Sequence, residues 1–209
     1  KKVYPFHRVC GEYVSNEVLD FLKRNNLYPD FLELPHIDTF EFSDTRGKSV
    51  FLPLDLGGFG ISRYQLDLWL YQLASEQGVK FLTGTTVTDL VFLEKEDLFQ
   101  VKLSDFQVLQ VPVVLGAFGK RSKLDQVLER PFFTKRSPYI GVKYHVLAEG
   151  SPNTVALHNF QGGYCGFNAI EEGKFNLCYL GSRDQLRAYG SIPEMEQAVL
   201  WKNPLLKRI

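Results

Sequence analysis

Two stretches of the chain carry the strongest fold signal, GGFGISRYQLDLWLYQLASEQGVKFL at residues 57–82 and VPVVLGAFGKRSKLD at residues 111–125. The first predicts a glycine-rich loop, a helix and a short strand. Ser62 precedes the helix, where its hydroxyl can accept a hydrogen bond from an unpaired backbone N–H. Gly78 follows the helix, at a position that commonly adopts a left-handed conformation. The apolar spacing predicts one buried helix face, made of Leu66, Trp69, Leu70 and Leu73.

The rest of this region predicts strands and a second helix. Residues 79–82 predict a buried strand, and residues 85–110 predict strands and turns. A Gly-Ala-Phe-Gly segment at 116–119 leads into a basic helix start that contains Lys120, Arg121 and Lys123. Cations oppose the dipole at a helix N-terminus unless an anion is bound. These residues therefore either approach a phosphate or form a solvated basic surface.

The flanking regions predict further regular structure. A helix is expected at residues 15–25, and a hairpin is expected from strands at 37–42 and 49–54. From residue 139, four strands joined by short turns predict an antiparallel sheet. Those strands are expected at residues 139–148, 154–160, 164–170 and 174–179. The tail from residue 192 has helical spacing at Met195, Val199 and Leu200.

Composition excludes several classes of protein. The 209 residues are 44% hydrophobic with zero formal net charge, which indicates a globular protein and gives no electrostatic case for nucleic acid or anionic membrane. No apolar run reaches the roughly 18 residues of a membrane span, and the start lacks a signal-peptide pattern. Cys10, Cys165 and Cys178 are odd in number and not closely spaced, which favours a reducing cytoplasm.

Three motifs resemble one known superfamily. They are R-x-x-L-D-x-x-L from Arg63, A-x-x-x-G-V from Ala74 and V-x-G-A-x-G-x-x-S ending at Ser122. This order resembles the flavin monooxygenase and geranylgeranyl reductase superfamily, whose fold is of the para-hydroxybenzoate hydroxylase type. The resemblance implies FAD as cofactor and NAD(P)H as reductant. It places Gly116, Gly119 and Ser122 beside the FAD, although Phe118 stands where the family has Asp.

The resemblance also assigns cofactor contacts near the N-terminus. Cys10 and Gly11 match a family stretch that lies near the flavin ring, and Glu12 replaces a second glycine there. The residues alone favour a surface loop with a buried thiol. The resemblance lets Arg63 reach the cofactor, whereas the residues alone also allow an exposed arginine paired with Asp67 four residues later.

The segment G-F-G-I-S-R at 58–63 is close to the dinucleotide fingerprint G-x-G-x-x-G. Arg63 occupies the position of the third glycine, and Pro53 is expected to interrupt the preceding strand. We therefore expect that this is not the pyrophosphate loop. The family resemblance suggests instead that these glycines let the backbone pass close to the flavin.

Residues 163–169, GYCGFNA, resemble the family's substrate-binding segment G-Y-x-W-x-F-P. Phe167 replaces its Trp, and Ala169 is not aromatic. We expect Gly166 and Phe167 to line a pocket for an apolar small molecule. The alternative for Phe167 is an ordinary sheet core.

The fold class expected is mixed α/β: a partial FAD-binding Rossmann-like domain with a β-meander, plus an antiparallel substrate-binding sheet. The FAD-binding part is expected at residues 1–35 and 55–130, the sheet at 36–54 and 131–185, and a helical segment at 186–209. The family's N-terminal G-x-G-x-x-G and C-terminal G-D motifs are missing from the sequence. We therefore expect an internal fragment that binds FAD weakly or not at all.

The leading hypothesis is a flavin-dependent oxidoreductase that acts on an apolar organic substrate, by hydroxylation or by reduction of an isoprenoid-like double bond. The Cys10-Gly11 stretch favours the reductase branch. The alternative is a non-catalytic module that binds a lipid or another small molecule. No metal site is expected, because the four histidines lack ligand spacing, and no hydrolase or kinase motif occurs.

Overall fold

The computed structural model describes residues 2–119, 122–134 and 137–209. The chain divides into two compact units. The sheet unit comprises Pro5–Val79 and Pro138–Ile209, and the meander unit comprises Lys1–Tyr4 and Lys80–Ser137. The predicted mixed α/β class is confirmed, with a seven-stranded sheet in the first unit and a three-stranded sheet in the second.

The seven-stranded sheet has the order β1-β3-β2-β8-β9-β10-β7. Its strands are β1 (Tyr13–Ser15), β2 (His36–Ser43), β3 (Ser49–Gly60), β7 (Tyr139–Val146), β8 (Thr154–Phe160), β9 (Gly163–Ala169) and β10 (Phe175–Ser182). The four late strands pair in antiparallel fashion, as predicted. The prediction of a wholly antiparallel sheet is wrong at one join, because β2 pairs with β8 in parallel. The predicted β2–β3 hairpin thereby joins the late strands in one sheet.

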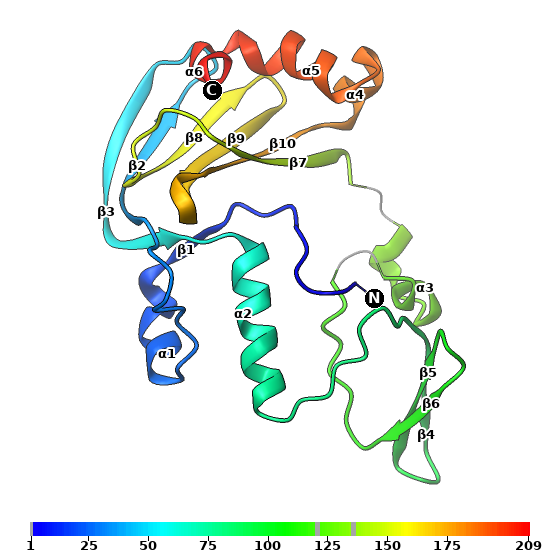
Figure 1. Cartoon of the computed structure of the whole chain (residues 1–209). Helices are drawn as coiled ribbons and strands as arrows, with labels where there is room; N and C mark the ends of the chain where they lie inside the picture. The colour runs from blue at the N-terminus through cyan, green and yellow to red at the C-terminus, as the bar shows by residue number, and fades with distance from the viewer. Residues whose placement is uncertain (1, 120–121, 135–136) are drawn as a thin grey trace. The chain divides into compact units, whose positions relative to one another are not determined.

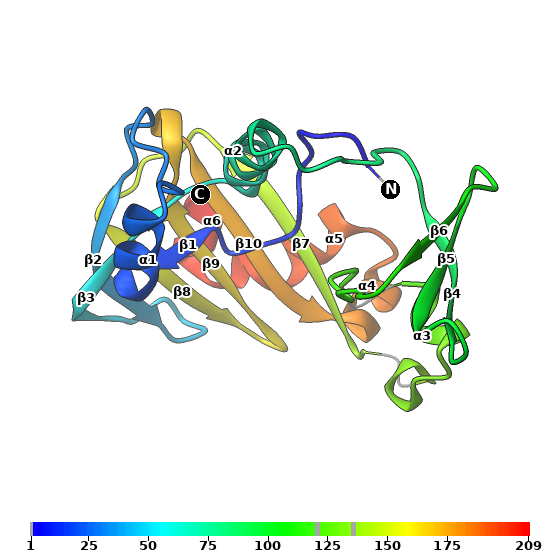
Figure 2. The ribbon, with the colours of Figure 1, turned by 90° about the horizontal axis from the view of Figure 1, so that it is seen from below.

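Helices lie on both faces of this sheet (Figures 1 and 2). The upper face is the one toward α4 (Arg183–Tyr189), α5 (Ile192–Val199) and α6 (Pro204–Arg208). The lower face is the one toward α1 (Leu19–Arg24) and α2 (Arg63–Glu76). Short 3-10 helices complete the unit at Asn16–Val18, Glu171–Gly173 and Leu200–Lys202.

The main core lies between the upper face and the C-terminal helices. Strand residues Phe160, Cys165 and Tyr179 meet buried residues of the helical segment, which are Met195, Val199, Leu200 and Leu206. The helical spacing predicted for the tail is confirmed, because its three predicted positions are all buried in this cluster.

Helix α2 has the predicted ends but not the predicted burial. Ser62 accepts a hydrogen bond from the Gln65 N–H at 3.1 Å, and Gly78 has a φ of 85°. No residue of α2 is fully buried, so the predicted buried face is wrong in degree. Trp69 instead donates its ring N–H to the Leu27 carbonyl at 3.0 Å. Apolar spacing identifies a stripe on a helix but does not tell how much of that stripe the chain covers.

Three local predictions around α2 are wrong. Residues 57–60 form the end of β3 rather than a loop. Pro53 does not interrupt that strand, because it lies opposite Thr39, next to a register shift in β2. Residues 79–82 form no strand, since no strand pairs with them; the Val79 N–H donates to the Ala74 carbonyl and closes the helix.

The meander unit contains the predicted strands and turns. β4 (Val87–Leu93), β5 (Leu98–Leu103) and β6 (Val108–Val111) form an antiparallel sheet in sequence order. Helix α3 (Leu124–Val127) and a 3-10 helix at Pro131–Thr134 follow. Lys120 and Arg121 of the predicted basic helix start lie outside the described residues.

Candidate functional site

Two rows of side chains cross the lower face of the sheet. One row contains Lys143, Cys178, Gly166, Leu157, Phe42 and Val50, and the next contains His145, Asn176, Asn168, Val155, Phe40 and Leu52. Residues directly opposite on neighbouring strands point to the same face. Each row therefore changes from a basic residue on β7 to apolar residues on β2 and β3. With strands about 4.8 Å apart, about 14 Å separates Lys143 from Leu157.

Glu12 is the centre of the charged end. Its buried carboxylate lies 2.6 Å from Lys143 Nζ through one oxygen and 2.6 Å from His145 Nε2 through the other. The backbone N–H of Arg63 donates to the same carboxylate at 2.8 Å. Burial of a carboxylate is costly unless it is paired and hydrogen-bonded. These three partners together make the buried position of Glu12 tolerable.

Strands β9 and β10 hold the segment that carries Glu12. Asn176 donates from Nδ2 to the carbonyls of Cys10 at 3.2 Å and Gly11 at 2.7 Å. Asn168 donates to the Glu12 carbonyl at 3.4 Å. Glu12 itself adopts a φ of 54°, which a non-glycine residue rarely does. The sheet therefore fixes an unusual backbone conformation at the residue that binds both basic side chains.

Arg63 is committed to an internal ion pair. Its guanidinium donates to both carboxylate oxygens of Asp67, at 2.7 and 2.9 Å, and Arg8 reaches the same carboxylate at 3.0 Å. The pKa of Arg63 is raised, first by the hydrogen bond to Asp67 and to a smaller extent by Cys10. The predicted pairing of Arg63 with Asp67 is confirmed. Cys10, two residues before Glu12 in the chain, lies close to Arg63.

The N-terminus of α2 is occupied by groups of the chain itself. Glu171 accepts a hydrogen bond from the Ser62 N–H at 2.8 Å, and Glu12 accepts the one from the Arg63 N–H. A helix N-terminus attracts anions, and these two carboxylates supply the negative charge. This agrees with the expectation that the glycines before α2 are not a pyrophosphate loop.

The other end of the rows is an apolar platform, defined by Phe40, Phe42, Val50, Leu52 and Leu157. Phe42, Val50 and Leu52 are exposed, and the rings of Phe40 and Phe42 lie 6.4 Å apart. Gly166 lies in the middle of the first row, beside this platform. Contiguous exposed apolar residues on one sheet face are typical of a binding surface.

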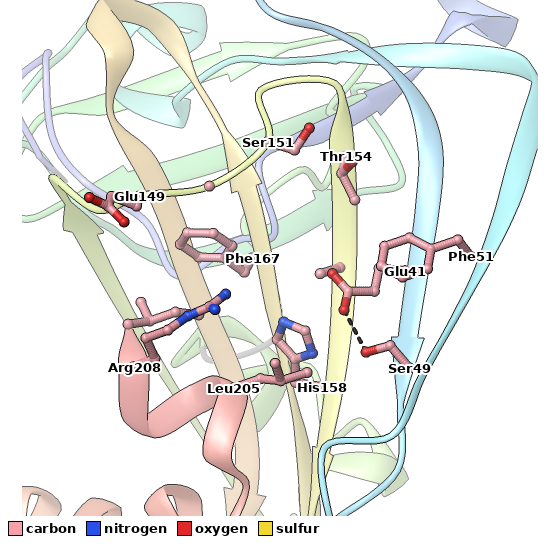
Figure 3. A pocket seen from close by; sticks show the side chains of 13 residues that line it. Glu41, Ser49, Phe51, Glu149, Ser151, Thr154, His158, Phe167, Leu205 and Arg208 are labelled. Carbon is pink, nitrogen blue, oxygen red and sulfur yellow. Dashed lines mark hydrogen bonds between the residues drawn. The ribbon is translucent and has the colours of Figure 1, made fainter.

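Phe167 lies on the upper face, because it follows Gly166 on the same strand. Its ring stacks on Phe175 with a centroid distance of 4.7 Å, and it lines a pocket of about 460 Å³ between β2, β3, β8 and α6 (Figure 3). In this pocket, Glu41 accepts a hydrogen bond from Ser49 at 2.6 Å. Gly166 and Phe167 therefore do not line one common cavity.

His158 is the buried titratable group of this upper pocket. Ser43 Oγ lies 3.0 Å from its Nδ1 and accepts a hydrogen bond from Asn203 at 3.2 Å. The Ser43 hydroxyl proton is thus free to bind Nδ1. Burial lowers the pKa of His158, Glu41 opposes this change, and Arg208 adds to it. The neutral form of the ring is accordingly favoured.

The remaining predicted cofactor residues belong to the meander unit, whereas Cys10, Gly11 and Arg63 belong to the sheet unit. These residues are Gly116, Gly119 and Ser122. The Ser122 hydroxyl accepts a hydrogen bond from the Leu124 N–H at 3.2 Å, just before α3. Gly119 has a φ of 74°, a conformation that favours glycine.

Two backbone positions fit the flavin that the resemblance implies. Among the described residues, no atom beyond the glycine and its chain neighbours lies within 4 Å of the place where a Cβ would stand at Gly11 or at Gly119, so a ring or phosphate can approach the main chain there. Arg63, by contrast, already pairs with Asp67, and the first N–H groups of α2 are bonded. The fit therefore rests on open glycine backbone rather than on a free cation at Arg63.

Neither a metal-binding cluster nor a membrane-spanning helix occurs in the part of the chain that the structure describes. Within the described ranges, no group of three or more His, Cys, Asp or Glu side chains could hold a metal ion. None of the described helices has the length and apolar character needed to cross a membrane. Cys10, Cys165 and Cys178 are all free thiols, and burial raises the pKa of Cys165.

Similarity to solved protein structures identifies the fold. No family model and no curated protein sequence matches the chain. Among solved structures, it is similar to PqsL, a probable FAD-dependent monooxygenase from Pseudomonas aeruginosa, with a TM-score of 0.66 and 17% identity over 89% of this chain and 54% of that one. The flavin-dependent halogenase CmlS gives a TM-score of 0.73 and 16% identity, covering 97% of this chain and 40% of that one.

The myxobacterial chondrochloren halogenase CndH, an FAD-dependent enzyme, gives a TM-score of 0.68 and 14% identity over 99% of this chain and 52% of that one. The chain thus has the fold of FAD-dependent monooxygenases and halogenases. It spans about half the length of these proteins.

Sequence reasoning did not find the charged end of the site. Lys143 and His145 were not singled out as partners of Glu12. Their alternation with apolar neighbours in β7, Val-Lys-Tyr-His-Val, puts both on one sheet face and was the available signal. Their partner is more than 130 positions away in the chain, and no local pattern reports such a contact.

Proposed function

We propose that the chain is part of an FAD-dependent oxidoreductase that acts on an apolar organic substrate, with NADH or NADPH as reductant. The observation that carries this proposal is a sheet face that runs from a buried ionic group to an exposed apolar platform, in the fold of FAD-dependent monooxygenases and halogenases. Flavin supplies the redox chemistry, and the protein supplies orientation and a site that excludes water.

The apolar platform is the proposed substrate surface. Phe40, Phe42 and Leu52 offer apolar contact on one face of β2 and β3. An isoprenoid-like chain or an aromatic ring suits such a surface. The Cys10-Gly11 stretch favours double-bond reduction over hydroxylation.

The cofactor residues remain those of the family resemblance. In the sheet unit, the proposed flavin contacts are Cys10, Gly11 and Arg63, and Arg63 would present its ion pair with Asp67 rather than a free cation. In the meander unit, they are Gly116, Gly119 and Ser122. Residues 1–35 and 55–130 would form the FAD-binding part, residues 36–54 and 131–185 the substrate sheet, and 186–209 a helical segment. The three free thiols support a reducing compartment such as the cytoplasm.

The experiment is the visible absorbance of purified protein, for this chain and for a longer chain that includes the G-x-G-x-x-G and G-D motifs of the family. We expect the oxidised-flavin band in the longer chain and a weak band or none in the 209 residues. Absence of flavin from both chains, even after addition of FAD, would overturn the proposal.

The second candidate is a binding module without redox turnover. The exposed apolar platform and the replacement of the family's Asp by Phe118 favour it. A protein of this kind would show no flavin band and would still bind an apolar ligand in a separate binding measurement.

A further inference from the structure

The upper pocket lies on the sheet face opposite the apolar platform. Its floor is one row of side chains from four neighbouring strands, which are Phe51 of β3, Glu41 of β2, Ala156 of β8 and Phe167 of β9. Helix α6 and the loop at residues 149–151 complete the lining (Figure 3). At about 460 Å³, the pocket has the size of sites that hold a small organic molecule.

His158 supplies one hydrogen-bond donor to this pocket. The residue is 3% exposed, and its Nδ1 lies 3.0 Å from the Ser43 hydroxyl. That hydroxyl already accepts a hydrogen bond from Asn203, and among the described residues Nδ1 is the acceptor within reach of its proton. The proton of the neutral ring is therefore on Nε2. No described residue forms a hydrogen bond with Nε2, and a buried donor without a partner is costly. A ligand acceptor in the pocket would satisfy it.

Side chains of both charges surround this donor. Burial lowers the pKa of His158, Glu41 opposes this change and Arg208 adds to it, so both charged groups act on the ring. Glu41 accepts a hydrogen bond from Ser49 through Oε1, which leaves Oε2 for a ligand. The guanidinium of Arg208 makes no hydrogen bond or ion pair with any described residue, and it reaches from α6 toward Phe167 (Figure 3). The pocket thus offers an acceptor on β2 and donors on β8 and α6.

We propose that the upper pocket binds a free α-amino acid with an aromatic or large apolar side chain, at a site separate from the proposed substrate surface. The ligand carboxylate accepts hydrogen bonds from Arg208 and from His158 Nε2, and the ligand ammonium group donates to Glu41. The ligand side chain lies against the Phe167 ring. Because Glu149 also lines the pocket, two carboxylates face one guanidinium, which disfavours an acid without an amine. The unpaired guanidinium in turn disfavours an amine without a carboxylate.

The first test compares three ligands that share a phenyl ring. Calorimetric titration of the 209-residue chain should show binding of L-phenylalanine. Phenylpropanoate, which lacks the amine, and phenethylamine, which lacks the carboxylate, should each bind about tenfold more weakly or worse. In ¹⁵N NMR, His158 should show the Nε2–H tautomer, and phenylalanine should shift its Nε2–H signal. No detectable binding of phenylalanine, or equal affinity for phenylpropanoate, would overturn the inference.

The second test alters the charged groups of the pocket one at a time. Arg208→Gln should remove the preference for phenylalanine over phenethylamine, because the carboxylate loses its charged partner. Glu41→Gln should remove the preference over phenylpropanoate, and its amide oxygen can still accept the hydrogen bond from Ser49. Lys207→Gln is the control, because Lys207 lies on the same helix and does not line the pocket. Preferences that stay the same in both pocket variants would contradict the proposed contacts and overturn the inference.

The longer chain that includes the flavin motifs separates this inference from the proposed function. Phenylalanine should bind the longer chain with the same Kd whether or not flavin is bound, because the pocket and the apolar platform lie on opposite faces of the sheet. Binding to the 209 residues and none to the longer chain would mean that another segment occupies the pocket, and would overturn the inference. Absence of flavin from the longer chain would overturn the proposed function alone.

Discussion

At the scale of the residue, Gly60 shows why the chain needs glycine at the end of β3. A Cβ at this position would stand 1.8 Å from the carbonyl oxygen of Ala169, the last residue of β9. Backbone cannot yield as a flexible side chain can, so the contact must be relieved by moving a strand. The sequence suggested that this glycine serves a cofactor; the contact shows that it first serves strand packing.

We therefore expect Gly60→Ala to lower the free energy of unfolding by about 3 kcal/mol or more. Gly11→Ala is the matched control, because no atom lies within 4 Å of its Cβ position, and it should change stability by less than about 0.5 kcal/mol. Urea unfolding followed by the fluorescence of Trp69 and Trp201, both in the sheet unit, measures both variants. Equal urea midpoints for Gly60→Ala and Gly11→Ala would show that the close contact at Gly60 does not limit stability.

His158 predicts how the stability of the protein depends on pH below neutrality. Because burial lowers its pKa from the ordinary 6.5, the unfolded chain binds a proton before the folded chain does as the pH falls. Stability is then lost as the pH drops from 6.5 toward the folded-state pKa, and is fully present above 6.5. His158→Gln should flatten this part of the profile. Thermal melts of both proteins below and above pH 6.5 test this prediction. If the melting temperatures of the two proteins fall equally with pH, the acid sensitivity belongs to other groups, and His7 is the first candidate.

At the scale of the element, α2 owes its start to three caps. The hydroxyl of Ser62 and the carboxylates of Glu12 and Glu171 accept hydrogen bonds from its first N–H groups. Two of these caps come from distant parts of the chain, so the helix start is tied to the charged end of the site. Loss of a cap should therefore lower the stability of α2 and also shift the position of Glu12.

Ser62→Ala should cost about 1 kcal/mol, the usual value of an N-cap. Ser75→Ala is its control on the same helix, because the Ser75 hydroxyl is exposed and only donates to the Tyr71 carbonyl at 2.8 Å, within the last turns. Hydrogen exchange of the α2 amides should report faster opening in Ser62→Ala alone. Similar exchange in both variants would mean that the two carboxylates suffice as caps.

At the scale of the whole molecule, periodicity and turn residues predicted most strands and helices. These features depend on neighbours in sequence, as with Ser62, Gly78 and the meander at residues 85–110. Sheet order and pairing direction depend on distant partners, so the parallel join of β2 to β8 was missed. The candidate site shows the same difference: Gly166 was predicted from a motif, whereas the partners of Glu12 became visible only in the folded sheet.

The apolar platform leads to the last prediction, because it belongs to the assembled sheet and to no single strand. Leu52 is 53% exposed at its edge, so Leu52→Lys should leave stability within about 0.5 kcal/mol while placing a charge on the surface. Binding of an apolar fluorescent dye should weaken about tenfold, or about 1.4 kcal/mol. Phe106→Lys is the control: Phe106 is 95% exposed but lies alone on a turn of the meander unit, so dye affinity should be unchanged. If Phe106→Lys weakens the dye and Leu52→Lys does not, the platform is not the apolar binding surface, and the substrate must be sought elsewhere in the fold.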